Sequence, residues 1–243
     1  MLVKSQVKYI QSLSQKKSRD EEGVFVAEGP KIINELLSAS NVPVQQLFAL
    51  KQWIQETPGL PAGAAIEVNE QELERLSHQP APNQVLGIFQ KPIFPKITTY
   101  RQRLSLVLDT IQDPGNMGTI LRCADWFGVD TIICSPESAD VFNPKVVQST
   151  MGGISRVQVI YEDLAAFLQQ QADVPAYAAT LHGTDLQAQG AITEGFLVIG
   201  NESKGIREEV LKLCRHRITI PRKGKAESLN AAVATGIILS HIS

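Results

Sequence analysis

A glycine-rich loop at residues 109–118 is the first of three polar segments whose residue types could support chemistry. Gly115 and Gly118 let a ligand or another backbone approach closely, because neither carries a side chain. Asn116 stands between them and is a good N-terminal cap for the helix that the following residues predict. The loop therefore has the composition of a binding loop at the start of a helix.

The helix after this loop separates its apolar and polar residues onto different faces. Ile120, Leu121 and Ala124 form the stripe that we expect to be buried, and Arg122 lies off that stripe. One interpretation is an ordinary surface arginine paired with Asp125, three residues along the helix. The glycine loop directly upstream favours the other interpretation, in which Arg122 has a functional role.

A second polar loop has the sequence GNESKG at residues 200–205, between a predicted buried strand and a helix. An ordinary turn from strand to helix would explain it. The segment lacks the G-x-G-x-x-G fingerprint of dinucleotide-binding proteins and the Gly-Lys-Ser/Thr ending of a P-loop. A ligand at this loop would therefore be held differently from the nucleotides in those two motifs.

The third segment, residues 220–230, precedes a helix of small residues that contains Gly236. A glycine inside a helix costs about 1 kcal/mol relative to alanine, which suggests that another element packs closely there. Ser228 and Asn230 stand at the start of this helix, where each could be a cap or a ligand contact.

Charge argues against a protein that coats nucleic acid by bulk attraction, because the net charge is −2 and the isoelectric point is near 6.1. Two local basic clusters could nevertheless hold phosphates, although such runs are usually solvated surface. They comprise Lys4, Lys8, Lys16, Lys17 and Arg19 near the start, and Lys212, Arg215, Arg217, Arg222, Lys223 and Lys225 near the end. A polyanion such as RNA could bridge them.

The elements that must position these loops fall into two domains. A small α/β domain is predicted at residues 1–92, a proline-containing linker at 93–102 and a larger α/β domain at 103–243. In the second domain, short apolar strands alternate with helices, which predicts a mostly parallel sheet covered on both faces. The predicted strands are 104–108, 131–134, 157–160, 176–180, 196–200 and 217–220. Ligands of such sheets collect beyond the carboxyl ends of the strands, where the three polar segments begin.

The three cysteines and four histidines follow no metal-ligand or disulfide spacing. We therefore expect no metal site and a reducing cytosolic environment. The first 13 residues lack the apolar core of a signal peptide, and no apolar run approaches the length that spans a membrane. A soluble, unprocessed, cytoplasmic protein is the expectation.

Three ordered motifs of this sequence resemble those of the SpoU/TrmH family of RNA ribose methyltransferases. The motifs are N-x-G with R-x-A-x-x-F-G at residues 116–128, G-N-E-x-x-G at 200–205, and I-P at 220–221 followed by S-L-N at 228–230. Residues 25–29 and the helix after them also resemble the small substrate-binding domain of many members, so the likeness covers nearly the whole chain. The resemblance implies a deep trefoil knot in the C-terminal domain and a homodimer.

The family pattern also implies a cofactor and a set of site residues. It assigns the methyl-transfer site to Asn116, Arg122, Glu202, Ser228 and Asn230, with Arg122 as the principal catalytic candidate. It places S-adenosylmethionine, bent within the knot, near Thr180, Leu181, Gly200, Asn201, Gly205, Ile220, Ser228 and Leu229. The sequence departs from the pattern at Ser203, where many relatives carry glycine.

The chemistry implied is an in-line displacement, in which a ribose 2'-hydroxyl attacks the methyl carbon and loses its proton. Arginine stays protonated, so we expect Arg122 to bind the adjacent phosphate and stabilise the developing alkoxide rather than act as a base. Ribosomal RNA is the expected substrate, and transfer RNA is the alternative. A non-catalytic RNA-binding member of the fold, methylation of a base nitrogen, and an enzyme that uses another nucleotide on a small metabolite also remain open.

Overall fold

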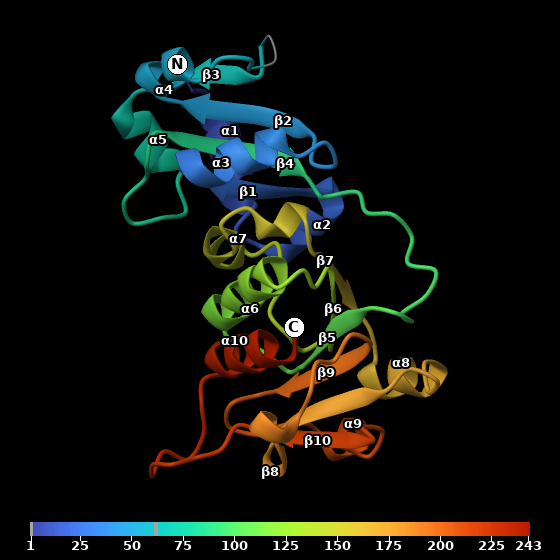
Figure 1. The fold of residues 1–243 in the computed structure, drawn as a ribbon. Coiled ribbons are helices and arrows are strands. Elements are labelled where there is room, and N and C mark those ends of the chain that lie inside the picture. Colours follow the sequence, from blue (N-terminus) through green and yellow to red (C-terminus); the bar gives the residue numbers. More distant parts are fainter. Residues whose placement is uncertain (1, 61–62) are drawn as a thin grey trace. The chain divides into compact units, whose positions relative to one another are not determined.

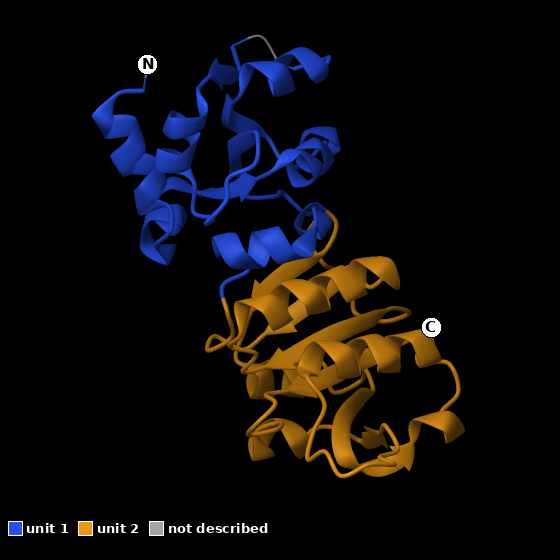
Figure 2. Cartoon of the chain, turned by 90° about the vertical axis from the view of Figure 1, so that its left-hand side faces the viewer, with its two compact units in different colours: residues 1–94, 140–155 blue, residues 95–139, 156–243 orange. Residues whose placement is uncertain are grey.

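The computed structural model describes residues 2–60 and 63–243, and these form two compact units (Figures 1 and 2). Unit 1 comprises residues 1–94 and 140–155, and unit 2 comprises residues 95–139 and 156–243. The chain therefore leaves unit 2 after Ala139 and returns to it at Arg156. No helix in the described part of the chain is long and apolar enough to cross a membrane.

Unit 1 is built on a four-stranded sheet in the order β1-β4-β2-β3. The strands β1 and β2 each pair antiparallel with β4, while β2 pairs parallel with β3. The strands are β1 (Val24–Glu28), β2 (Val44–Ala49), β3 (Ala65–Glu67) and β4 (Val85–Gln90). The helices are α1 (Lys4–Ser12), α2 (Lys16–Glu22), α3 (Pro30–Ser38), α4 (Lys51–Glu56), α5 (Glu70–Leu76) and α7 (Pro144–Thr150), followed by a 3-10 turn η1 (Gly153–Ser155).

Local sequence explains how the elements of unit 1 begin and what they bury. Every residue of β1 is buried, and α3 buries Ile32, Ile33 and Leu36 at helical spacing. The helix α5 begins at a capping box, in which Asn69 accepts a hydrogen bond from the backbone of Glu72 and the Glu72 side chain accepts one from the backbone of Asn69.

Residues 140–155 belong to unit 1 although the sequence predicts them within the second domain. The helix α7 packs against β1, and Phe142 lies 5.4 Å from Phe25 between ring centroids. Asp140 forms an ion pair with Arg19, whose side chain is almost fully buried. The predicted domain boundary follows the sequence motifs, whereas this division follows the packing of the core.

Unit 2 contains a six-stranded sheet in the order β10-β8-β9-β5-β6-β7, and all neighbouring strands are parallel. This confirms the predicted α/β class with a largely parallel sheet. The strands are β5 (Leu104–Asp109), β6 (Thr131–Cys134), β7 (Gln158–Tyr161), β8 (Ala176–Asp185), β9 (Gly195–Gly200) and β10 (His216–Thr219). The helices are α6 (Pro114–Trp126), α8 (Leu164–Gln170), α9 (Glu208–Leu211) and α10 (Ala231–Ile242), with a 3-10 turn η2 (Leu186–Ala188).

Helices cover both faces of this sheet (Figure 1). On one face, α6 packs against α10. On the other, the apolar residues of α8 and α9 join a core cluster with alternate strand residues such as Val107 and Val198. Strands buried on both sides explain why the sequence shows nearly continuous apolar runs rather than alternation.

The strand β8 is longer than predicted, because it continues from Thr180 to Asp185. Its pairing with β10 shifts register between Arg217 and Ile218. A Cβ placed at Gly183 would lie 2.6 Å from the backbone carbonyl carbon of Arg217, so only glycine fits where these backbones meet.

Candidate functional site

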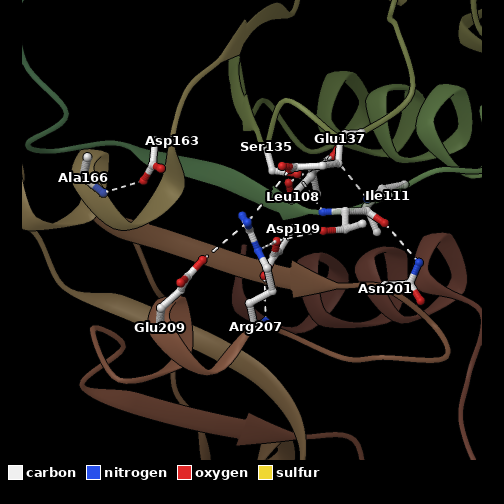
Figure 3. A network of polar contacts seen from close by, with 12 residues as sticks. Leu108, Asp109, Ile111, Ser135, Glu137, Asp163, Ala166, Asn201, Arg207 and Glu209 are labelled. Carbon is white, nitrogen blue, oxygen red and sulfur yellow. Dashed lines mark hydrogen bonds and ion pairs between the residues drawn. The ribbon is translucent and has the colours of Figure 1, made fainter.

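A buried carboxylate at the carboxyl end of β5 organises the loops beyond the sheet (Figure 3). The side chain of Asp109 is inaccessible to solvent and accepts hydrogen bonds from the backbone nitrogen of Arg207, at 2.7 Å, and from its Nε, at 2.8 Å. Burial lowers the pKa of Arg207, but the charge of Asp109 and its hydrogen bond outweigh this effect, so the net pKa is raised. The segment after β9 is thereby fixed to the end of β5.

A second contact joins the same two loops. Thr110 has a φ of 60°, a left-handed conformation, and its backbone nitrogen donates to Ser135 Oγ at 3.0 Å. Its carbonyl accepts a hydrogen bond from Asn201 Nδ2 at 3.0 Å. The side-chain oxygen of Asn201 in turn accepts from the backbone nitrogens of Ser203 and Lys204. The side chain of Asn201, a predicted cofactor residue, therefore holds the loop conformation.

Two predicted glycines of the second loop are required by its geometry. A Cβ at Gly200 would lie 2.4 Å from the backbone carbon of Gly205, which is too close for any side chain. Gly205 has a φ of 69°, which favours glycine. Backbone hydrogen bonds in both directions between Asn201 and Gly205 close the loop into a narrow turn.

Asn116, Glu202 and Asn230 meet, and they bring together the three polar segments singled out from the sequence. Asn116 Nδ2 donates a short hydrogen bond to Glu202 Oε1, and Asn230 Nδ2 donates to Asn116 Oδ1 at 2.8 Å. Asn230 also caps α10, because its oxygen accepts from the backbone nitrogens of Ala232 and Val233. One cluster thus couples the starts of two helices to the loop after β9.

The cap of α6 differs from the prediction. Asp113 is the N-cap, and its carboxylate accepts a hydrogen bond from the backbone nitrogen of Asn116 at 2.8 Å. Asn116 lies in the first turn of the helix, and its side chain points to Glu202 and Asn230 instead. The prediction that Asn116 caps the helix was wrong because Asp113 satisfies the free backbone nitrogen first.

Arg122 is exposed on α6, and no hydrogen bond or ion pair of its guanidinium is found in the described part of the chain. Its expected structural partner, Asp125, instead binds Arg156, with Nε at 2.9 Å from the carboxylate. The alternative of an Arg122–Asp125 surface pair is therefore wrong. Arg122 presents an exposed cation on the same helix that carries Asn116.

The remaining predicted residues lie on β8 and on the segment before α10. Thr180 Oγ1 donates to the carbonyl of His182 at 2.7 Å, and Ser228 is exposed. Ile220 is half-buried at the end of β10. Within residues 2–60 and 63–243, no hydrogen bond or ion pair joins these side chains to Asn116, Glu202 or Asn230.

Two predicted cofactor residues are apolar side chains that remain exposed. Leu181 is 65% exposed in the part of β8 that follows its pairing with β9, and Leu229 is 45% exposed in the segment between β10 and α10. Exposed leucines can cover the apolar part of a ligand such as an adenine ring. Together with the open space beside Gly205, where a Cβ would meet no atom within 4 Å, this arrangement fits a nucleoside cofactor held largely by backbone groups.

Sequence reasoning missed the pairing of Asp109 with Arg207. An acidic residue that ends an otherwise apolar strand was the available signal, since a charge buried there needs a partner. Sequence reasoning was also wrong in counting Arg19 among the phosphate-binding cations. Arg19 is buried, and it donates to the carbonyl of Leu13 at 2.7 Å and pairs with Asp140.

The cysteines offer no activated nucleophile. Burial raises the pKa of Cys214 to about 11 and that of Cys134 still further, so both thiols stay protonated at neutral pH. Burial also raises the pKa of Cys123. Among the described residues, no group of three or more His, Cys, Asp or Glu side chains is placed to hold a metal ion.

Comparison with known proteins gives two family matches. The family model described as SpoU rRNA Methylase family matches residues 103–240, and the MRM3-like substrate binding domain matches residues 4–87. A relative named 23S rRNA (guanosine(2553)-2'-O)-methyltransferase RlmP, from Bacillus subtilis (strain 168), is 29% identical over 243 residues. That alignment covers 97% of this chain and 95% of the relative.

Solved structures match over the full length. A TrmH-family protein from Porphyromonas gingivalis is 36% identical, with a TM-score of 0.86, and the match covers 99% of this chain and 98% of that one. An AdoMet-bound rRNA methyltransferase from Sinorhizobium meliloti is 32% identical, also with a TM-score of 0.86. That match covers 100% of this chain and 95% of the Sinorhizobium chain.

Proposed function

Because the chain belongs to the SpoU rRNA methylase family, we propose that it transfers a methyl group from S-adenosylmethionine to a ribose 2'-hydroxyl of ribosomal RNA. The observation that carries the proposal is the meeting of Asn116, Glu202 and Asn230, of which Asn116 lies on the same helix as the exposed cation Arg122. Three segments far apart in sequence converge there. The proposed transfer uses neither a metal ion nor a thiol nucleophile.

The chain's own residues would align the ribose and stabilise charge. The guanidinium of Arg122 binds the phosphate next to the target ribose and stabilises the alkoxide that develops on the 2'-oxygen. The proton itself leaves to a phosphate oxygen or to water. Glu202 orients Asn116, whose amide is fixed on its other side by Asn230. When bound, S-adenosylmethionine supplies an electrophilic methyl group on its sulfonium.

The cofactor would be held by the second half of β8 and by the loops after β9 and β10. The backbone at Gly205 admits close approach, Gly200 lets the loop fold tightly against itself, and the exposed side chains of Leu181 and Leu229 offer apolar contact. Thr180, Asn201, Ile220 and Ser228 complete the proposed set. We also propose the trefoil knot of the family for this unit, since two backbones meet without side-chain space at Gly183.

Ribosomal RNA is favoured as the substrate by the full-length relatives. The Bacillus subtilis relative, which aligns with nearly the whole of this chain, is named for methylation of 23S rRNA. We propose that residues 1–92 select the RNA, that 93–102 link the domains and that 103–243 perform the transfer. We also propose that the protein acts in the cytoplasm.

A homodimer is the proposed assembly, supported by apolar side chains that α6 and α10 leave exposed. Trp126 on α6 is 82% exposed, and Val233 and Ile237 on α10 are 52% and 38% exposed. The two helices pack against each other, so these residues belong to one layer of unit 2 (Figure 1). A second copy could cover a surface of this kind.

Transfer of labelled methyl groups to unmodified RNA tests the function. The protein is incubated with labelled S-adenosylmethionine and in vitro transcribed ribosomal RNA or transfer RNA, and the product nucleosides are separated. Label in a 2'-O-methyl nucleoside of ribosomal RNA is expected. Label in a base would overturn the ribose assignment, and label confined to transfer RNA would overturn the substrate.

A matched pair of arginine variants assigns the catalytic role. Arg122→Ala should lower kcat by about 100-fold, the scale of losing one contact made in the transition state. Arg101→Ala is the control, because Arg101 is also exposed in unit 2 but pairs with Asp173. Equal activity of the two variants would remove Arg122 from the site.

A further inference from the structure

Unit 1 contains two neighbouring clefts that are separate from the methyl-transfer residues. They have volumes of about 340 and 370 Å³, and both are lined by Glu28 and Gln148. The first also includes His78 and Lys145, and the second includes Lys31. All the lining residues belong to unit 1, and Lys145 and Gln148 come from α7, the helix contributed by the later part of the chain (Figure 2).

Polar side chains at these clefts have unused hydrogen-bonding capacity. In the described part of the chain, no hydrogen bond or ion pair is found for Lys31 Nζ, Lys145 Nζ or the Gln148 amide. Lys31 and Lys145 are exposed and Gln148 is half-buried. Two cations and an amide thus line the two clefts without a partner among the described residues.

Glu28, the acidic residue that lines both clefts, already accepts hydrogen bonds within the protein. Glu28 is buried, and its carboxylate accepts hydrogen bonds from Ser77 Oγ and from the backbone nitrogen of His78, the latter at 2.8 Å. His78 is itself fixed, with Nε2 lying 3.1 Å from the carbonyl of Ile10. These bonds hold the floor of the first cleft rigid, and the carboxylate retains lone pairs that can accept from a ligand amino group.

Two residues with left-handed backbone line the second cleft. Gln84 has a φ of 58° and Met151 a φ of 52°. Met151 is the C-cap of α7, where a left-handed residue commonly ends a helix. Gln84 lies directly before β4, so a helix end does not explain its conformation, and strain of this kind gathers at binding sites.

We propose that these clefts bind an unpaired nucleotide of the substrate RNA, outside the nucleotide that is methylated. The apolar walls of Pro80 and Pro144 would contact the base, and Gln148 and Glu28 would bond its edge. Lys31 and Lys145 would bind the flanking phosphates. The inference rests on the proposed function insofar as the ligand is the RNA that the enzyme modifies.

The volumes agree with a ligand of this size, since sites for small organic molecules occupy about 300–1,000 Å³. Two phosphates flanking one base match two cations in neighbouring clefts, Lys145 in the first and Lys31 in the second. An acidic peptide would use the lysines but would place further carboxylates beside the buried carboxylate of Glu28, whereas the edge of a base can donate to it. A nucleotide supplies both kinds of group, which is why RNA is favoured over a protein partner.

A double variant with a matched control tests the site in the full-length protein. Lys145→Ala/Gln148→Ala removes one cation and one amide from α7. Lys51→Ala/Gln55→Ala removes the same two side-chain types from the exposed face of α4, outside both clefts. Equilibrium binding is measured with in vitro transcribed ribosomal RNA, and S-adenosylmethionine binding is measured separately.

The cleft variant should bind the RNA about tenfold more weakly, which corresponds to about 1.4 kcal/mol, with unchanged cofactor affinity. The control should match the wild type. Equal RNA affinity of the two double variants would overturn the proposal, as would an unchanged affinity in Lys31→Ala combined with Lys145→Ala. Because binding is scored without turnover, wild-type protein that binds RNA without forming 2'-O-methyl nucleosides would contradict the proposed function alone.

Photo-crosslinking then locates the contact. The same transcript carrying 4-thiouridine should crosslink to peptides containing residues 78–80 or 144–148. Crosslinks confined to other parts of unit 1 would overturn the cleft as the site. Loss of these crosslinks in Lys145→Ala/Gln148→Ala, and their retention in the control, is the expected pattern.

Discussion

The carboxylate of Asp109 binds Arg207 at two points, the backbone nitrogen and the guanidinium Nε. With the bond from Asn201 to the carbonyl of Thr110, it anchors the loop after β9 at both ends. Glu202 lies between these anchors, so its position against Asn116 is fixed by contacts outside the cluster. The geometry of the proposed methyl-transfer site therefore depends on a residue at the end of a different strand.

Asp109→Asn should lower the free energy of unfolding by about 1–3 kcal/mol, since the amide leaves a donor of Arg207 poorly paired beside a buried group. Urea unfolding followed by circular dichroism measures the effect. Glu137→Gln is the control, because Glu137 is exposed and lies 3.9 Å from the Arg207 guanidinium. A loss of unfolding free energy as large in the control as in Asp109→Asn would show that the buried carboxylate stabilises the fold no more than the exposed one.

Asn116→Ala should lower kcat by at least about tenfold, the scale of one lost positioning contact, and should leave the fold intact. The backbone cap from Asp113 does not involve the Asn116 side chain, so helix α6 keeps its start. Thr119→Ala on the same helix is the control, since its hydroxyl bonds only the local carbonyl of Gly115. Steady-state methyl transfer gives the rates, and thermal unfolding excludes a folding defect.

His78 should make the protein less stable as the pH falls below about 6.5. Burial lowers the pKa of His78 in the folded state, whereas the unfolded chain takes up the proton near pH 6.5. The stabilisation is thus complete above that pH and is lost as the pH falls through the lower folded pKa. We expect His78→Gln to weaken this dependence relative to wild type, measured as unfolding free energy between pH 7.5 and 5.

The exposed His182 provides the comparison for that experiment. His182→Gln should retain the wild-type pH dependence over the same range. If His78→Gln and wild type lose stability in parallel on acidification, protonation of His78 contributes nothing to the pH dependence of the unfolding free energy.

Trp126→Glu should convert the proposed dimer to monomer, because it replaces the most exposed apolar side chain of α6 and α10 with a charge. Sedimentation velocity gives the mass. Ile93→Glu is the control, since Ile93 is 70% exposed but belongs to unit 1. A wild-type protein that sediments as a monomer would contradict the proposed assembly directly.

The sequence predicted the strands of unit 2 well, because strands buried on both faces appear as short apolar runs with clear ends. It also indicated which loops carry polar residues to the edge of the sheet. What it could not provide were partners distant along the chain. Asn116 finds Glu202 and Asn230 across 86 and 114 positions. Local spacing holds no information on such pairs.

The same limit explains the errors over Arg19 and Asp125. As a sequence feature, Arg19 is one of five cations in a basic run, but Asp140, 121 positions away, draws it into the core. Asp125 suits Arg122 by helical spacing, yet Arg156 competes for it from another segment. Gly236 does face α6, in agreement with the close packing that the cost of a glycine inside a helix suggested. A Cβ there would lie 3.5 Å from Cys123 Sγ, however, so an alanine would also fit.

The excursion of residues 140–155 into unit 1 bears on how this protein could be recombined with its relatives. A chimera joined at the linker would take β1 and Arg19 from one parent, and α7 and Asp140 from the other. The part proposed to select the substrate is therefore not a detachable cassette. Exchanging specificity between two such enzymes requires grafting two stretches of chain at once. A sequence change in either stretch also constrains the changes that the other can accept.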